Sequence, residues 1–351
     1  MWDVIGILIK IGIVVGITQG AVAYLILVER KIAAWSQDRI GPNRAGPFGL
    51  LQPLADGAKM LLKEDVVPSY VTKPLYILAP IIAIIASMIA FAVIPFGPVG
   101  QTGASLGKGD IQFQIAPGID IGIVYIFAIG SLGVYAVILA GWSSNNKFSF
   151  LGGLRSSAQL ISYEVPLGMS ILGMVLITRS LDLNAIVNWQ DAHTWGIVAQ
   201  PIGFLLFLIS AFAETNRLPF DLPESEQELV GGFHTEYSAM KFGMFFLGEY
   251  LHVITVSYLV VVLFLGGWDM PFVTNSLQTG WFWALVKVGI MLAKVSGMIV
   301  FIMWIRWTLP RFRYDTLMDL AWKRLIPIAI ANLVITAAIL QLARGYFHVS
   351  W

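Results

Sequence analysis

The segment IGILIKIGIVVGITQGAVAYLILV, at residues 5–28, carries a single charged side chain, Lys10, in a mostly apolar run. A helix needs about 20 apolar residues to cross the hydrocarbon core of a bilayer, which is roughly 30 Å thick. The run is too long for the apolar region of a signal peptide, and neither a basic stretch nor a small-residue cleavage site accompanies it. The segment therefore predicts a retained transmembrane helix.

Seven further apolar blocks follow along the chain. They lie at about 75–96, 119–141, 160–178, 198–214, 238–265, 282–305 and 325–343. The 351-residue sequence is 57% hydrophobic and 12% charged, with a mean hydropathy of +0.77, and this is too little charge to cover a soluble domain. Because open sheet edges are not tolerated in hydrocarbon, we predict an all-α membrane protein. It has about eight transmembrane helices in a single domain, residues 1–351.

The charge of the connecting loops predicts how the chain crosses the membrane. With eight spans, the loops after the first, third, fifth and seventh carry 15 Lys and Arg residues. The other loops carry two, Lys108 and Arg179. Positive loops stay in the cytoplasm, so we predict that both termini lie on the non-cytoplasmic side.

Composition also limits the chemistry of the chain. It contains no cysteine and so holds neither a disulfide nor a cysteine-bound iron–sulfur cluster of its own. The four histidines are scattered, and no spacing typical of a zinc or calcium site occurs, so we predict no metal site. A net charge of +1 gives no reason to expect nucleic acid as a partner.

The predicted cytoplasmic loop at 29–74 is too long for a simple connector. It opens with RIGPNRAGPFG (39–49), whose glycines and prolines interrupt regular helix. LLQPLADGAKMLLKED (50–65) follows, with leucines at helical spacing on one side and Asp56, Lys59 and Lys63 on the other. This pattern predicts an amphipathic helix, which could lie on the membrane surface or pack against a neighbouring subunit.

Glu249 and Glu164 are acidic residues that fall within predicted spans. Glu249 is about eleven residues into the sixth span, where an ionised side chain costs roughly 2.5–3.5 kcal/mol to insert. It could serve a proton relay or a ligand, or it could form a structural ion pair with a lysine: Lys241, Lys287 or Lys294. Glu164, in SYEVP, is expected in the first turn of the fourth span, where a helix dipole favours an acid.

A second predicted cytoplasmic loop, residues 213–237, is strongly acidic. Six acids surround one base, Arg217; they are Glu214, Asp221, Glu224, Glu226, Glu228 and Glu236. The loop could be simply solvated, but its apolar stretches favour a polar funnel between the spans. In such a funnel, crowding and burial would raise the pKa of some of these acids towards neutrality.

Five long segments of this sequence resemble subunit 1, called H in bacteria, of the proton-pumping NADH:quinone oxidoreductases (complex I). They are ERKIAAWSQDRIGPNRAGPFGLLQPLADGAKMLLKED (29–65), SYEVP (162–166), AETNRLPFDLPESEQELVGGFHTEY (213–237), FLGEY (246–250) and LPRFRYDTLMDLAWK (309–323). They occur in the family's order along almost the whole chain. The resemblance implies eight transmembrane helices and a multi-pass location in the cell inner membrane, with an organellar inner membrane as a less favoured alternative.

The resemblance also implies roles for individual residues. It assigns to the quinone chamber Arg30, Arg39, Asp56, Arg217 and Phe246. It assigns to proton coupling Glu164, Glu214, Glu249, Asp221, Glu224, Glu226 and Glu228. Lys294 also aligns with a polar position of the family.

The function implied is a subunit that walls the quinone chamber and couples quinone reduction to proton translocation. Quinone is then the substrate, and iron–sulfur clusters and flavin belong to partner subunits. The implied partners are peripheral iron–sulfur and quinone-site subunits, small membrane subunits, antiporter-like subunits and lipid. Two alternatives stay open: the homologous subunit of a hydrogenase or formate hydrogenlyase, and a stand-alone ion-coupled transporter, which would show discontinuous spans and internal pseudo-symmetry.

Overall fold

The computed structural model describes residues 2–98, 113–223, 226–271 and 280–347, and these residues form helices and loops without a strand. The all-α prediction is confirmed. The elements are α1 (Trp2–Ser36), η1 (Pro47–Gly49), α2 (Gln52–Leu62), α3 (Lys73–Ile89), η2 (Ala90–Ala92), α4 (Gly122–Gly130), α5 (Leu132–Ser143), α6 (Lys147–Thr178), α7 (Leu183–Ala192), α8 (Gly196–Ala199), α9 (Pro201–Glu214), α10 (Glu226–Leu229), η3 (Gly232–His234), α11 (Ala239–Phe264), α12 (Trp281–Thr308), α13 (Tyr314–Asp319), the π-helical η4 (Leu320–Leu325) and α14 (Ile326–Phe347).

Within these described residues, seven helical segments are long and apolar enough to cross a membrane. They correspond to seven of the eight predicted blocks, with α4 and α5 forming one segment and α13, η4 and α14 another. The remaining block, at 198–214, contains α9, whose 14 residues fall short of a full span. The structure thus confirms a multi-pass helical membrane protein, while the count of eight spans stays a prediction.

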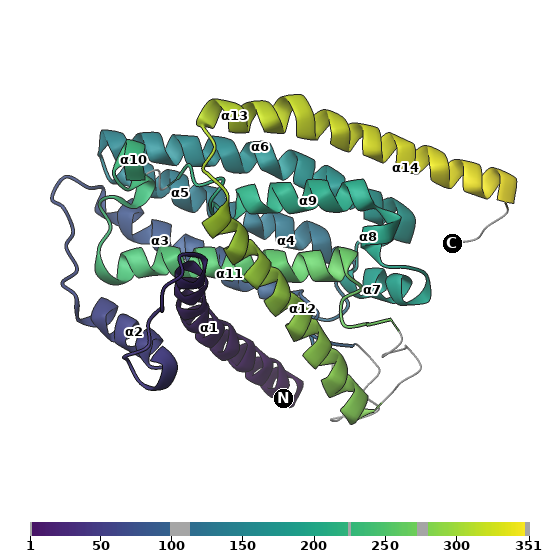
Figure 1. Cartoon of the computed structure of the whole chain (residues 1–351), viewed down its shortest axis with the longest axis horizontal. Helices are drawn as coiled ribbons and strands as arrows, with labels where there is room; N and C mark the ends of the chain where they lie inside the picture. The colour runs from purple at the N-terminus through teal and green to yellow at the C-terminus, as the bar shows by residue number, and fades with distance from the viewer. Residues whose placement is uncertain (1, 99–112, 224–225, 272–279, 348–351) are drawn as a thin grey trace.

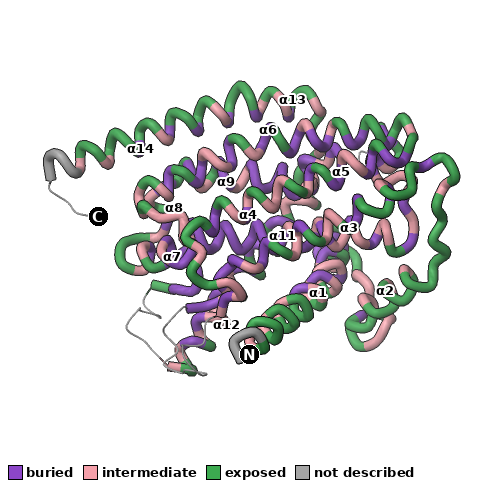
Figure 2. The backbone as a smooth tube through the Cα atoms, turned by 180° about the vertical axis from the view of Figure 1, so that it is seen from behind, coloured by how far each residue is buried: buried purple, intermediate pink, exposed green. Residues whose placement is uncertain are grey.

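The bundle is built around α11. In its most apolar window 78% of the residues are buried, against 17% for α1. Figure 1 shows α11 running beside α3 and α9, with α1 and α12 crossing at a steep angle and α14 along the far edge of α6. Figure 2 shows largely exposed residues along α1 and α14, the lipid-facing pattern expected for apolar helices at the rim.

The fourth span begins well before the predicted residue 160. The side chain of Asn146 accepts a hydrogen bond from the Phe148 amide and caps α6, which then runs unbroken from Lys147. Small residues allow this polar first half to pack closely: a Cβ built on Gly152 would lie 2.7 Å from the Cα of Gly232. Glu164 consequently lies in the middle of α6, so its predicted place in a first turn is wrong.

The loops gather at two opposite ends of the bundle. At one end the basic loops meet: Lys241 pairs with Asp65 at 2.5 Å, and Arg155 pairs with Glu228 at 2.6 Å. At the other end, the Asn184 side chain donates to the Gln114 side chain at 3.0 Å. Which side of the membrane each end faces stays a prediction, and so does the assignment of the termini to the non-cytoplasmic side.

The helix predicted after the first span is α2. It lies at the edge of the bundle, beside α1 and below the start of α11 (Figure 1), and none of its residues is buried. Leu51, Leu54, Leu61 and Leu62 are exposed beside it or on it. Such a leucine-rich surface requires an apolar covering, which fits both a membrane surface and a neighbouring subunit.

Candidate functional site

A large cavity opens between α1, α2, α11 and α12; we call it the α2 cavity. Its volume is about 620 Å³. Four of the residues expected in a quinone chamber line it together: Arg30, Arg39, Asp56 and Phe246. They come from α1, the turn after it, α2 and α11, so residues separated by more than two hundred positions meet in one place.

The walls of the α2 cavity are mostly apolar, with polar groups at two points. Ile26, Met60 and Leu247 are among the apolar lining residues. Near α2, the Arg30 guanidinium donates to Asp56 Oδ2 at 2.6 Å, and Gln52 donates to the other carboxylate oxygen. An apolar cavity with a few fixed polar groups is typical of a site for an amphipathic small molecule.

The second polar group lies deeper and is centred on Glu29, which the sequence motifs did not single out. Glu29 is buried and lines the α2 cavity with Tyr250 and Arg306. The Tyr250 hydroxyl donates to Glu29 Oε2 at 2.6 Å, and the Arg306 guanidinium donates to Oε1. Glu29 directly follows one apolar block and Arg306 directly follows another. A charged residue is common at the end of a span, so nothing in the sequence indicated that these two residues form part of a site.

Arg217 connects this group to a second cavity. Its guanidinium lies 3.7 Å from Glu29 Oε2 and 3.5 Å from Glu249 Oε2, and it stacks 4.2 Å from the centre of the Tyr250 ring. Arg217 is buried and does not line the α2 cavity itself. The cation beside Glu249 is therefore Arg217, whereas Lys241 pairs with Asp65.

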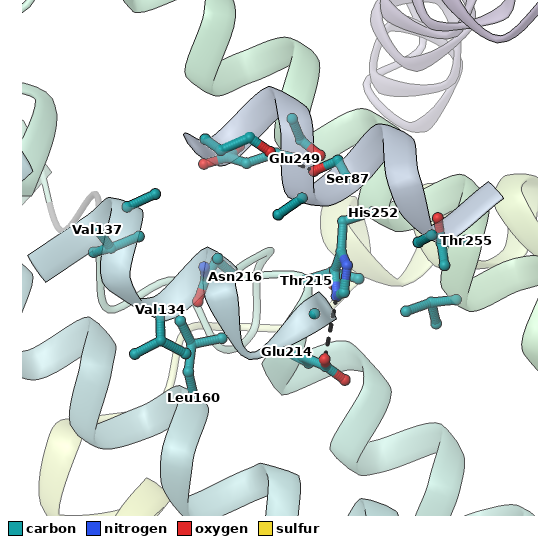
Figure 3. A pocket seen from close by; sticks show the side chains of 18 of the residues that line it. Ser87, Val134, Val137, Leu160, Glu214, Thr215, Asn216, Glu249, His252 and Thr255 are labelled. Carbon is teal, nitrogen blue, oxygen red and sulfur yellow. Dashed lines mark hydrogen bonds and ion pairs between the residues drawn. The ribbon is translucent and has the colours of Figure 1, made fainter. Parts of the chain in front are cut away.

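The second cavity, which we call the buried acid cavity, has a volume of about 100 Å³. Glu164, Glu214 and Glu249 all line it, from α6, α9 and α11. The hydroxyl of Ser131, at the break between α4 and α5, donates to Glu164 Oε1 at 3.0 Å. Figure 3 shows Glu214 and Glu249 on either side of this space, with His252 pointing from α11 towards Glu214. The three acids that the resemblance assigns to a relay thus share one buried space.

The acidic loop does not bring all of its carboxylates together. Glu228 is exposed and pairs with Arg155 at 2.6 Å and with Arg311 at 3.7 Å. The hydrogen bond from Arg155 lowers the pKa of Glu228, so the expected rise through crowding does not apply to it. Asp221 is half-buried, Glu226 belongs to the short helix α10, and Glu224 lies outside the described residues.

Both lysines of α12 have their own surroundings inside the bundle. Lys287 is buried, with 1% of its surface exposed. Lys294 donates to the carbonyl oxygens of Leu265, Gly267 and Asp269, at 2.5–3.0 Å, just beyond the end of α11. These carbonyls satisfy the ammonium group and give Lys294 a structural role.

Throughout the described part of the chain, no group of three or more His, Asp or Glu residues could hold a metal ion. Both cavities instead combine carboxylates with arginine, tyrosine or histidine. Such groups can bind a polar head group by hydrogen bonds, and they can exchange protons.

Comparison with known proteins agrees with this geometry. A family model described as NADH dehydrogenase matches residues 9–337. The chain is 48% identical over 320 residues to H subunit 1 of the NADH-quinone oxidoreductase of Cytophaga hutchinsonii, covering 91% of this chain and 92% of that protein. It is 47% identical over 347 residues to H subunit 2 of the same enzyme from Koribacter versatilis, covering 95% and 97%. The chain belongs to the H-subunit family of NADH-quinone oxidoreductase.

A third relative, the H subunit of the Leptospira biflexa enzyme, is 50% identical over 312 residues, which cover 87% of this chain and 86% of that protein. The matches include the helices that carry both cavities, because the family model spans α1 to α14. The family identified from the sequence motifs is therefore confirmed.

Proposed function

We propose that this membrane subunit walls the quinone-binding chamber of an NADH-quinone oxidoreductase and couples quinone reduction to proton translocation. The observation that carries the proposal is the α2 cavity, where Arg30, Arg39, Asp56 and Phe246 meet. Its apolar walls suit a prenyl tail and its polar groups suit a quinone head group. The exposed leucines of α2 lie at the place where such a lipid-soluble molecule would enter from the bilayer.

The electrons would come from other subunits. The sequence has no cysteine to hold an iron–sulfur cluster. We infer that peripheral iron–sulfur and quinone-site subunits close the open side of the chamber, and that flavin lies farther along the same assembly. Small membrane subunits and antiporter-like subunits would cover the apolar rim together with lipid, in the inner membrane of the cell.

The coupling would be electrostatic. Reduction of a quinone to a quinol takes two electrons and two protons, and the head group carries negative charge while the electrons have arrived and the protons have not. The charge at the head of the chamber therefore changes during turnover. Glu29 would sense this charge through its place in the α2 cavity, and Arg217 would transmit it because its guanidinium lies near both Glu29 and Glu249. Glu249 faces the same buried space as Glu214 and Glu164, where the charge change would favour uptake or release of a proton.

Two other functions are compatible with parts of the sequence. A hydrogenase or formate hydrogenlyase subunit would share the fold, but the relatives compared above are named NADH-quinone oxidoreductase subunits. A stand-alone transporter would need a substrate site formed where its spans are broken. At the described break between α4 and α5, the Ser131 hydroxyl is instead hydrogen-bonded to Glu164. Both observations favour the quinone enzyme.

A pair of substitutions on α2 tests the chamber. Gly57 lines the α2 cavity, and a Cβ built on it meets no atom within 4 Å, so Gly57→Trp would fill the cavity without a backbone clash. Ala58 is the exposed neighbour and does not line the cavity, so Ala58→Trp is the matched control. In the complete enzyme we expect Gly57→Trp to raise the quinone KM about tenfold, which is about 1.4 kcal/mol. Equal quinone KM values in the two variants would refute the chamber assignment.

A further inference from the structure

His252 differs chemically from the rest of the buried acid cavity. It is the only basic side chain among the described residues that line this cavity. Its Nε2 lies 3.6 Å from Glu214 Oε1 and has no hydrogen-bond partner among the described residues. Figure 3 marks this approach with a dashed line. A buried ring nitrogen aimed at a carboxyl, yet slightly beyond hydrogen-bond length, is placed to exchange a proton after a small side-chain rotation.

The imidazole shares the cavity with carboxyl groups from three helices. Glu249 lies three positions before His252 on α11, so both project from one face of that helix into the cavity. Glu214 comes from α9 and Glu164 from α6. On α3 and at the start of η2, which form another wall, the lining residues are small and not ionisable: Ala83, Ala86, Ser87 and Ala90. The Ser87 hydroxyl already donates to the backbone, and so it does not compete for the imidazole.

We propose that His252 carries protons between Glu214 and Glu249, an inference that rests on the coupling function proposed above. The protonated Glu214 carboxyl passes its proton from Oε1 to Nε2 of the neutral ring, leaving a carboxylate and an imidazolium. The imidazolium then releases the proton on Nδ1 towards Glu249. The ring ends neutral with its proton on the other nitrogen, and one proton has crossed from one carboxyl to the other.

The dimensions of the cavity suit this role. Its volume of about 100 Å³ has room for a few water molecules, which complete a path between the ring and Glu249. Imidazole suits such a step because it can take up a proton on one ring nitrogen and release one from the other. Without it, the two carboxyls would exchange protons only through water.

Four variants of the complete enzyme, assayed in inverted membrane vesicles, test the relay. The variants are His252→Gln, His252→Ala, Glu214→Gln and the control Thr255→Val. Thr255 lies about one turn after His252 on α11 and lines the same cavity. Its hydroxyl donates to Leu251 O of its own helix, so this control changes the cavity wall without touching a titratable group. Quinone reduction is measured with an uncoupler, and proton uptake is measured in parallel with a pH-sensitive dye.

We expect His252→Gln to assemble and to lower proton uptake per quinone reduced at least tenfold, because a positioned proton-transfer group typically contributes about 10²–10⁴-fold to rate. Added imidazole should restore part of the uptake in His252→Ala, because its side chain leaves space for the ring, and should not restore it in Glu214→Gln. A blocked proton path could also stop quinone reduction in His252→Gln. In that case the relay is supported if imidazole restores both quinone reduction and proton uptake in His252→Ala.

Normal proton uptake in His252→Gln overturns the relay, and so does failure of imidazole to restore His252→Ala. The Glu214→Gln variant separates failure of the relay from failure of the coupling function. If it is uncoupled while His252→Gln is normal, the acids couple without the histidine. If both pump normally, the coupling function itself is wrong.

Discussion

The guanidinium of Arg217 lies 3.5 Å from the carboxylate of Glu249 and so joins the acidic loop to the middle of α11. The same guanidinium lies 3.7 Å from Glu29, which lines the α2 cavity, whereas Glu249 lines the buried acid cavity. One buried cation thus stands between two carboxylates that belong to different cavities. A charge change beside one carboxylate is therefore felt by a cation that also lies within 4 Å of the other carboxylate.

Replacement of Arg217 should separate its charge from its geometry. Arg217→Gln leaves Glu29 and Glu249 buried without this cation, and breaking a buried pair in this way costs about 3–5 kcal/mol. We expect a lower melting temperature and poor assembly.

Arg217→Lys keeps the charge but cannot reach both carboxylates with a planar group, so we expect near-normal assembly with proton translocation reduced several-fold. Thermal unfolding of the purified enzyme and vesicle proton uptake measure these effects. Equal coupling in Arg217→Lys and wild type would argue against transmission through this residue.

Asp56→Asn should affect quinone use more than stability. The Arg30–Asp56 pair is partly exposed, and such pairs contribute only about 0–1 kcal/mol to folding. The change leaves the Arg30 guanidinium at the cavity wall without its carboxylate, which alters the polarity beside a bound head group. We expect a several-fold change in the quinone KM with an unchanged melting temperature. Asp319→Asn, in the exposed Lys323–Asp319 pair away from the cavity, is the matched control. A change in melting temperature without a change in KM would assign Asp56 a structural role.

Much of the fold could be predicted because an apolar block long enough to cross a bilayer rarely forms anything other than a transmembrane helix. The same signal identified Glu249 as unusual, since an acid in the middle of α11 is not explained by composition. The start of α6 was misplaced because its first half, KFSFLGGLRSSAQ, reads as a polar loop. In the structure this stretch is helical and packs closely against Gly232 through Gly152, and such a contact between distant residues is not visible in local sequence.

The sequence predicted the site residues that lie in recognisable motifs. It missed those that belong to the site only because the fold brings distant residues together. Glu29 and Arg306 are 277 positions apart, and each follows an apolar block, where a charged residue is ordinary. Only the crossing of α1 by α12 brings them together. His252 was set aside as one of four scattered histidines, because sequence spacing cannot show that α9 places Glu214 beside it.

Asp269 should give the stability of this subunit a distinct pH dependence. Burial raises the pKa of Asp269 to about 6, from 3.8 for an ordinary aspartate, and Asp191 adds to the rise while Lys287 and Lys294 oppose it. The folded chain therefore keeps a proton that the unfolded chain releases between about pH 4 and 6. Protonation of Asp269 therefore adds to the free energy of unfolding in full below about pH 4. This added stability falls as the pH rises from about 4 to 6, and the free energy of unfolding changes no further through Asp269 above that.

Asp269→Asn removes this loss, because the amide stays neutral at every pH. We expect the variant to be more stable than wild type above pH 6, by on the order of 2 kcal/mol, and similar to it near pH 4. Melting temperatures of the detergent-purified enzyme between pH 4.5 and 8 give the comparison, since other titrating groups cancel in the difference. Parallel curves for the two proteins would show that Asp269 does not ionise in this range.

Gly152 should be intolerant of any side chain, because it sets the distance between α6 and the acidic loop. A Cβ at this position lies 2.7 Å from Gly232 Cα and 2.8 Å from the Phe233 backbone nitrogen, and backbone atoms cannot move aside as a flexible side chain can. Gly152→Ala must therefore push η3 away from α6 and move the loop that carries Arg217. Overpacking of this kind costs about 1–3 kcal/mol, so we expect a lower melting temperature together with weaker proton coupling.

Gly168→Ala is the matched control on the same helix, since its Cβ meets no atom within 4 Å and alanine favours helix by up to about 1 kcal/mol. Equal melting temperatures for Gly152→Ala and Gly168→Ala would mean that the acidic loop is not held by this contact, and the position of Arg217 would then depend on its ion pairs alone.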